Sequence, residues 1–184
     1  MDITYLGGDT VKLAGKNLNV ICDPAKSTTA SKSLAKANVV SWSTEGLSHP
    51  NSVDDAMVLD LPGEYEVGGA MINGVAAGET TMFSFNIDGV NVVVTGPVAG
   101  ELSADRLETL GKVDALVIRV GDHAAAAALV AKLEPAYVIP VGYEKTPEVF
   151  LKEMGVNPEP VAKLKLSPKD LPTETQVVVL TPAA

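Results

Sequence analysis

The sequence contains few of the residues from which metal centres are commonly built. Of its 184 residues, 2 are histidines and 1 is a cysteine. A single cysteine excludes both an internal disulfide and a cysteine-based zinc cluster. Aromatic residues make up only 4% of the chain, whereas hydrophobic residues in total reach 46%. The core must therefore be built mainly from aliphatic side chains, within a composition that is typical of globular proteins.

Basic residues are also scarce: 14 Lys and Arg stand against 23 Asp and Glu, giving a net charge of −9. Nucleic acids and anionic membranes are bound by basic patches, so we expect neither as a partner. No apolar run approaches the roughly 18 residues of a membrane span, and no signal peptide is recognisable. These features predict a cytoplasmic protein, and the length predicts one domain over residues 1–184.

Short alternating runs in the first half of the chain predict a series of strands. They cover residues 3–6, 10–13, 18–22, 39–42, 58–61, 64–67, 71–77, 82–87 and 90–94. Turn pairs such as Gly7-Gly8 and Asp88-Gly89 separate several of them and predict antiparallel pairing. The Glu64–Val67 run alternates in the manner of an edge strand.

The second half predicts alternating helices and strands. Helices are expected over 104–110 and 124–133, and from Pro147 to Gly155; strands are expected over 115–118, 137–141, 162–166 and 176–180. His123 falls in the first turn of the second helix, beside Asp122, where we interpret it as a polar first-turn residue and not as a ligand. Cys22 and Trp42 lie in apolar runs and are predicted to be buried. Two packed sheets with outer helices follow from this order.

Several stretches resemble the metallo-β-lactamase fold. These are Tyr5-Leu6-Gly7-Gly8, Cys22-Asp23-Pro24, Pro62-Gly63-Glu64-Tyr65-Glu66-Val67-Gly68-Gly69 and Ile139-Pro140-Val141-Gly142-Tyr143. The third is similar to the corresponding segment of the small branch that contains L-ascorbate-6-phosphate lactonase-like proteins and zinc-dependent hydrolases. The resemblance implies an α+β fold, a four-layer αββα sandwich of two mainly antiparallel or mixed sheets. It also implies a zinc site at one rim of the sheets.

The zinc ligands of the family are mostly replaced in this sequence. Thr44 and Gly46 stand where the first two motif histidines fall, Ser48 replaces the motif aspartate, and only His49 is retained. Glu45 lies between the first two of these positions. The positions of this ancestral-site rim are Gly8, Thr44, Glu45, Gly46, Ser48, His49, Gly78, Pro97 and Gly142. Because zinc needs three or four ligands, we expect no metal cofactor and no metal-ligating residue here.

Three hypotheses for the function remain at this stage. The first is a metal-free pseudoenzyme with a binding or structural role. The second is a hydrolase of lactones or phosphoesters that uses Glu45 and His49, the only catalytic candidates, as an acid–base pair. The third is a subunit whose rim contacts a protein partner or a second copy of the chain. A weak Mg²⁺ or Ca²⁺ site that adds Ser48, Asp54 and Asp55 is a minor alternative, and the sequence identifies no small-molecule ligand.

Overall fold

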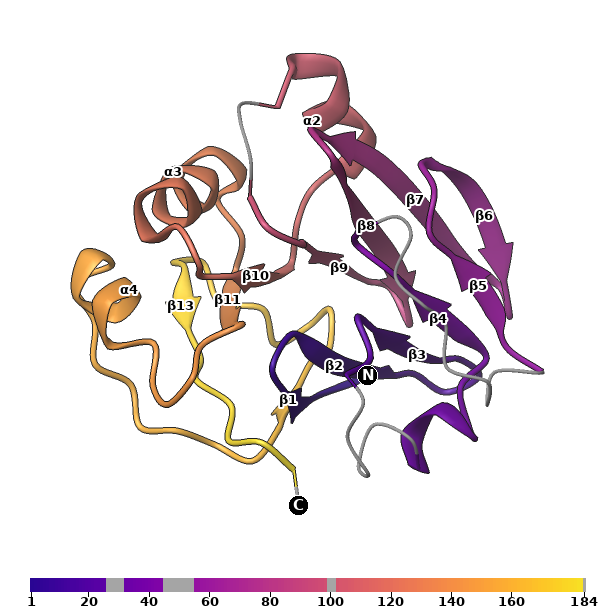
Figure 1. Cartoon of the computed structure of the whole chain (residues 1–184), viewed down its shortest axis with the longest axis horizontal. Coiled ribbons are helices and arrows are strands. Elements are labelled where there is room, and N and C mark those ends of the chain that lie inside the picture. Colours follow the sequence, from indigo (N-terminus) through magenta and orange to yellow (C-terminus); the bar gives the residue numbers. More distant parts are fainter. Residues whose placement is uncertain (26–31, 45–54, 99–101, 184) are drawn as a thin grey trace.

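Two β-sheets packed face to face form the centre of the computed structural model, which describes residues 1–25, 32–44, 55–98 and 102–183 (Figure 1). The first sheet has the order β12-β1-β2-β3-β4-β5. Its strands are β1 (Asp2–Gly7), β2 (Thr10–Ala14), β3 (Asn19–Cys22), β4 (Val39–Ser41), β5 (Met57–Leu59) and β12 (Leu164–Lys165).

The second sheet has the order β13-β11-β10-β9-β8-β7-β6. Its strands are β6 (Gly63–Val67), β7 (Ala70–Ala77), β8 (Thr80–Ile87), β9 (Val90–Val94), β10 (Ala115–Arg119), β11 (Tyr137–Val141) and β13 (Gln176–Val177). The meander from β6 to β9 is antiparallel, as its turn pairs predict. Asp88 and Gly89 both have positive φ, which is the backbone geometry of a tight hairpin turn between β8 and β9. The edge position predicted for Glu64–Val67 is confirmed.

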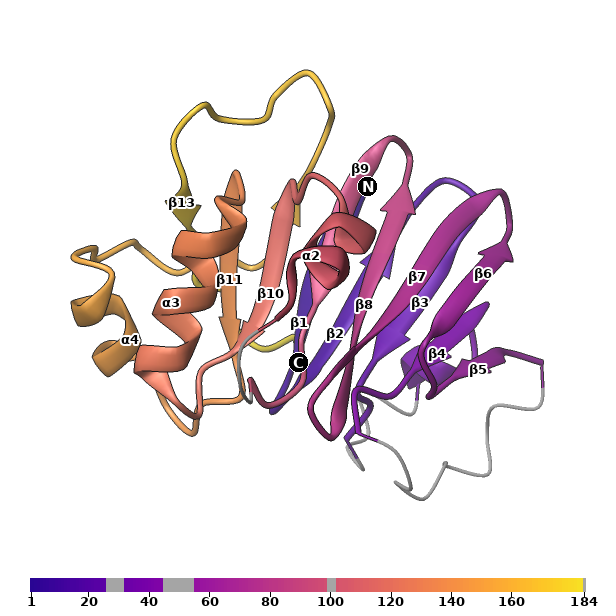
Figure 2. The ribbon, with the colours of Figure 1, turned by 90° about the horizontal axis from the view of Figure 1, so that it is seen from above.

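Helices cover the outer face of the second sheet (Figure 2). They are α2 (Ala104–Leu110), α3 (His123–Leu133) and α4 (Glu148–Glu153). Leu110, Leu129 and Phe150 bring the three helices into one buried cluster with side chains of the sheet. Asp122 begins α3, because its Oδ1 accepts a hydrogen bond from the N–H of Ala125 at 3.0 Å. None of the described helices is long and apolar enough to cross a lipid bilayer.

The outer face of the first sheet carries a smaller apolar cluster. Leu34, in the helical residues 32–34, packs there with Ile21 and Trp42. The arrangement of outer helical segments on two central sheets confirms the predicted sandwich of two mixed sheets. Trp42 is 5% exposed and Cys22 is fully buried, so both burial predictions are confirmed. Burial also raises the pKa of the Cys22 thiol, which keeps it protonated and unreactive.

The last two strands are shorter than predicted. Residues 162–166 form only the two-residue β12, and residues 176–180 form only the two-residue β13. Both strands lie at sheet edges, so each pairs with a single neighbour. Beyond β13 the pairing reduces to an isolated bridge between Val161 and Leu180. Alternation in the sequence therefore overestimated the length of these edge strands.

Substitutions at two adjacent residues of β7 test how much the apolar packing between the sheets contributes to the stability of the fold. Ile72 is fully buried there, whereas Met71 points outward and is 50% exposed. We expect Ile72→Ala to lower the free energy of unfolding by about 2–5 kcal/mol, because it removes apolar burial and leaves a cavity. Met71→Ala, the matched control, should stay within about 0.5 kcal/mol of the wild type. Urea denaturation followed by circular dichroism measures both values, and equal losses would contradict this packing.

Candidate functional site

The described positions of the ancestral-site rim all lie where strands end. Gly8 follows β1, Thr44 follows β4, Gly78 separates β7 from β8, Pro97 follows β9, and Gly142 follows β11. Glu45, Gly46, Ser48 and His49 lie outside the described residues, as does Asp54. The acid–base pairing of Glu45 with His49 therefore stays a prediction. Four of the five described positions are brought together in two groups, and the fifth, Gly78, lies in the turn before β8.

The first group gathers around Thr80, the first residue of β8. Thr44 forms an isolated antiparallel bridge with Thr80. The Oγ1 of Thr80 donates to the carbonyl oxygen of Ala77 at 2.9 Å and lies 3.4 Å from that of Pro97. One residue further on, the N–H of Thr81 donates to the carbonyl oxygen of Ser43 at 2.8 Å. These bonds join the end of β4 in one sheet to the start of β8 in the other.

The second group consists of Gly8 and Gly142. The N–H of Gly142 donates to the carbonyl oxygen of Gly8 at 2.8 Å, and both residues have positive φ. A Cβ atom at position 142 would lie 2.6 Å from Cγ of Arg119 and 2.6 Å from Oδ1 of Asp9. Those two side chains form an ion pair, with Arg119 Nε 3.3 Å from Asp9 Oδ1. The ion pair thus takes the space that a side chain at Gly142 would need.

Asp23 connects the two groups electrostatically. Its Oδ1 accepts a hydrogen bond from the N–H of Ser43 at 2.7 Å, next to the Thr44 bridge. The pKa of Asp23 is raised to about 6, chiefly by burial and to a lesser extent by the nearby charge of Asp9. The hydrogen bonds from Ser43 and the positive charge of Arg119 act in the opposite direction. Asp23 therefore takes up its proton at a higher pH than an exposed aspartate does.

Gly96 allows the segment after β9 to pack closely against Ser43, at the end of β4. A Cβ atom at this position would overlap Oγ of Ser43, so only a glycine allows β9 and the end of β4 to approach so closely. Ser43 itself is 6% exposed. The rim is therefore filled by direct contacts between its own loops in the described part of the chain.

These residues do not fit a zinc ion. Across residues 1–25, 32–44, 55–98 and 102–183, no three His, Cys, Asp or Glu side chains are grouped so as to hold a metal. The described rim positions are Gly, Thr and Pro, none of which supplies an imidazole, thiolate or carboxylate. The two carboxylates nearby, Asp9 and Asp23, lie beside the guanidinium of Arg119, whose charge would repel a divalent cation.

Asp9, Asp23 and Arg119 were missed as site residues in the sequence analysis. Each had a signal that could have found it. Asp9 follows the Gly7-Gly8 turn, Asp23 ends an apolar strand, and Arg119 is the single charged residue of the otherwise apolar β10. Charged residues at the ends of buried strands commonly line the sites of α/β proteins. Their contact could not be foreseen, because residues 9 and 119 belong to different sheets.

Residues 2–142 match the family model described as the beta-lactamase superfamily domain. No curated protein matches the sequence. Among solved structures, the chain is similar to a metallo-β-lactamase superfamily protein of Thermotoga maritima, proposed to be a Zn-dependent hydrolase. The two share 26% identity over 98% of each chain, with a TM-score of 0.79.

Two further solved structures share the fold at lower identity. One, from Veillonella parvula, is proposed to be a metal-dependent hydrolase; it is 12% identical over 90% of this chain and 99% of its own, with a TM-score of 0.66. The other is an isothiocyanate hydrolase from Delia radicum gut bacteria. It is 12% identical over 100% of this chain and 98% of its own, with a TM-score of 0.65.

Two glycines with nearly equal φ test the packing at the rim. Gly142 (φ +76°) faces the Asp9–Arg119 pair, whereas a Cβ atom at Gly155 (φ +69°) would meet nothing within 4 Å. Gly155→Ala should cost only the left-handed backbone penalty of about 1–2 kcal/mol. Gly142→Ala should cost at least about 1 kcal/mol more, because it also displaces the ion pair. Thermal and urea unfolding compare the two variants, and equal losses would show that the rim has room at position 142.

Asp23→Asn tests the charge of the buried carboxyl. The folded-state pKa of Asp23 is raised from 3.8 to about 6, so its protonation favours the folded state as the pH falls through this window. The amide keeps the acceptor oxygen for Ser43 but does not titrate. We expect the variant to gain stability relative to the wild type between pH 4 and pH 8, by about 1–3 kcal/mol. Urea unfolding across this range checks the trend; a pH-independent difference would contradict it.

Proposed function

Since the chain belongs to the beta-lactamase superfamily, with residues 2–142 matching the domain, we propose that it is a metal-free, non-catalytic member of that superfamily. In this proposal the fold of the hydrolases is kept and the rim serves a binding or structural role. The small and mostly uncharged side chains at the rim suit contact with another protein or a second copy of the chain.

The packing at Gly142 is the observation that carries the proposal. A side chain at this position is excluded by two atoms at 2.6 Å, one from Asp9 and one from Arg119. The family's final ligand is therefore replaced by a residue without a side chain, and the vacated space is used by an ion pair. A single reversion to histidine would not rebuild the site, because the pair would have to move first.

The charges at the rim support the same conclusion. In a zinc hydrolase the metal compensates the negative charge of the carboxylates around it and activates a water molecule. Here Arg119 forms an ion pair with Asp9, so this carboxylate is stabilised by a fixed cation of the chain. At Asp23 burial outweighs the charge of Arg119, and the pKa is raised. An arginine remains protonated at any physiological pH and cannot generate a metal-bound hydroxide.

The alternative is a hydrolase of lactones or phosphoesters that uses Glu45 and His49. Membership of a superfamily that includes hydrolases favours it, and a carboxylate with an imidazole can transfer protons without a metal. The small branch containing L-ascorbate-6-phosphate lactonase-like proteins is the subfamily we propose on the Pro62–Gly69 segment. Under this alternative, activity would depend on the His49 imidazole.

Metal analysis combined with a hydrolysis screen separates the two functions. We expect the purified protein to contain far less than one zinc or manganese ion per chain, also after incubation with either metal and desalting. We expect no turnover of lactone, ester or phosphodiester substrates by the wild type or by His49→Ala. A zinc hydrolase of the same fold, prepared in parallel, controls for metal loss. Stoichiometric metal with turnover would overturn the proposal, and turnover that His49→Ala abolishes would establish the alternative.

A further inference from the structure

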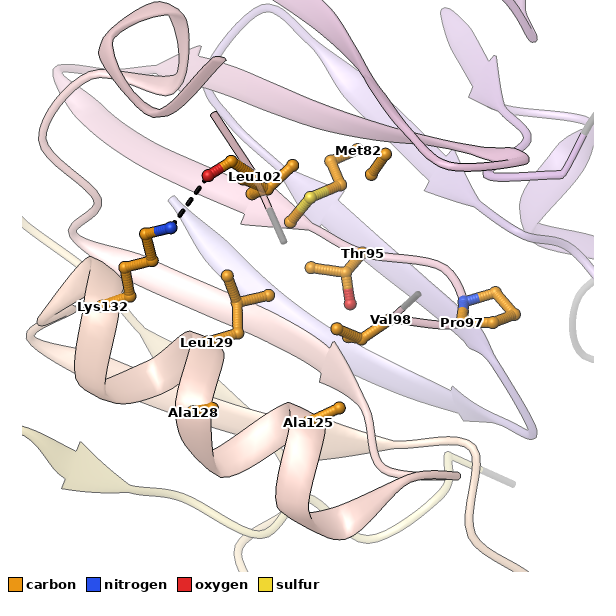
Figure 3. Close-up of a pocket in the computed structure, with 10 residues that line it drawn as sticks. Met82, Thr95, Pro97, Val98, Leu102, Ala125, Ala128, Leu129 and Lys132 are labelled. Carbon is orange, nitrogen blue, oxygen red and sulfur yellow. Dashed lines mark hydrogen bonds between the residues drawn. The ribbon is translucent and has the colours of Figure 1, made fainter. Parts of the chain in front are cut away.

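A cavity of about 290 Å³ lies between α3 and the outer face of the second sheet (Figure 3). Met82 from β8 and Leu129 from α3 form apolar parts of its lining, and both are buried. Ala125 and Ala128 line the helix side, and Lys132 stands at one end. Ala128 and Lys132 are exposed, so the cavity opens to solvent on this side.

The alanines of α3 explain why this space is left unfilled. Residues 124–128 are five consecutive alanines, and the helix rests on the sheet through Ala126, Leu129 and Val130. At Ala125 and Ala128 the side chain ends at Cβ, so the volume that a leucine would fill stays open (Figure 3). Pockets that bind small molecules have volumes from about 300 Å³ upward, and the present one lies at that lower limit. An apolar cavity of about 150 Å³ is already large enough to bind benzene.

Among the described residues that line the cavity, Lys132 alone is charged. Its Nζ donates to the carbonyl oxygen of Leu102 at 2.8 Å, across the mouth of the cavity (Figure 3). A carbonyl is neutral, so the positive charge of Lys132 is not compensated by this bond. Within the ranges that the structure describes, no carboxylate lies in ion-pair distance of Lys132. The ammonium therefore has donor capacity left for an anion at the end of an apolar cavity.

We propose that this cavity binds a small amphipathic monocarboxylate, a straight-chain fatty acid of about eight carbons. The alkyl chain would lie against Met82 and Leu129, and the carboxylate would bind Nζ of Lys132. Benzene, with six non-hydrogen atoms, fills a cavity of about 150 Å³. At the same number of atoms per volume, the cavity of about 290 Å³ holds roughly ten to twelve non-hydrogen atoms. Octanoate has ten. This site does not depend on the function proposed for the rim.

The chemistry of the lining selects against other small molecules. A primary amine of equal length would place a second cation beside Lys132, which is repulsive at short range. An alcohol would keep the apolar contacts but lose the charge-assisted hydrogen bond. A ligand of this size in such a site binds with a Kd on the order of 0.1 mM. The order of affinity should be octanoate first, octan-1-ol second and octylamine last.

Titration of the full chain with octanoate, octan-1-ol and octylamine, followed by isothermal calorimetry and amide chemical shifts, tests the proposal. We expect octanoate to bind at least tenfold more tightly than octan-1-ol, with shifts concentrated on α3 and β8. Ala125→Leu should lower the affinity for octanoate at least tenfold, because the new side chain fills the cavity. Ala131→Leu, on the exposed side of the same helix, is the matched control and should bind as the wild type does.

Lys132→Gln provides a second and independent variant. The variant should bind octanoate only as tightly as it binds octan-1-ol. Its affinity for octan-1-ol should equal that of the wild type, because only the charge is lost. Circular dichroism melts confirm that each variant is folded before titration. The proposal is overturned if octanoate does not bind at millimolar concentration, if octylamine binds as tightly, or if Ala125→Leu and Ala131→Leu retain equal affinity.

Discussion

The apolar contact between the two sheets is the constraint on which the rest of the structure depends. Side chains alternate along each strand, so a slip of one residue would turn the buried face of a strand to solvent. Burial therefore fixes the register of strands such as β1 and β11, and with it the residues at which they end. Gly8 and Gly142 meet for this reason, although 134 residues separate them. The positions of the rim residues therefore follow from the packing of the core.

The described part of the rim is held together by contacts among the chain's own residues. Here backbone hydrogen bonds link Gly142 to Gly8 and Thr81 to Ser43, and an arginine provides the positive charge. The half-exposed Asp9–Arg119 pair contributes little stability by itself, since surface ion pairs are worth at most about 1 kcal/mol. Its importance is steric, because it fills the space beside Gly142.

Much of the fold could be predicted from the sequence, since alternation and turn pairs are local signals. The meander through Asp88-Gly89, the edge position of Glu64–Val67 and the helix capped by Asp122 all follow from neighbouring residues. The contents of the rim could not, because Asp9 and Arg119 meet only after both sheets have formed. Motif positions along the sequence do not show which side chains surround them in the fold.

The end of β9 connects the rim and the cavity without making them one site. Thr95, directly after β9, lines the sheet side of the cavity, and its Oγ1 accepts a hydrogen bond from the N–H of Arg119 at 3.3 Å. The side chain of Arg119 reaches the other way, to Asp9 at the rim. The rim depends on charges and backbone bonds between loops, whereas the cavity depends on the short alanines of α3. Pro97 belongs to both features, but the Asp9–Arg119 pair lies only at the rim and the alanines of α3 lie only at the cavity, so each feature can be altered by substitutions that leave the other in place.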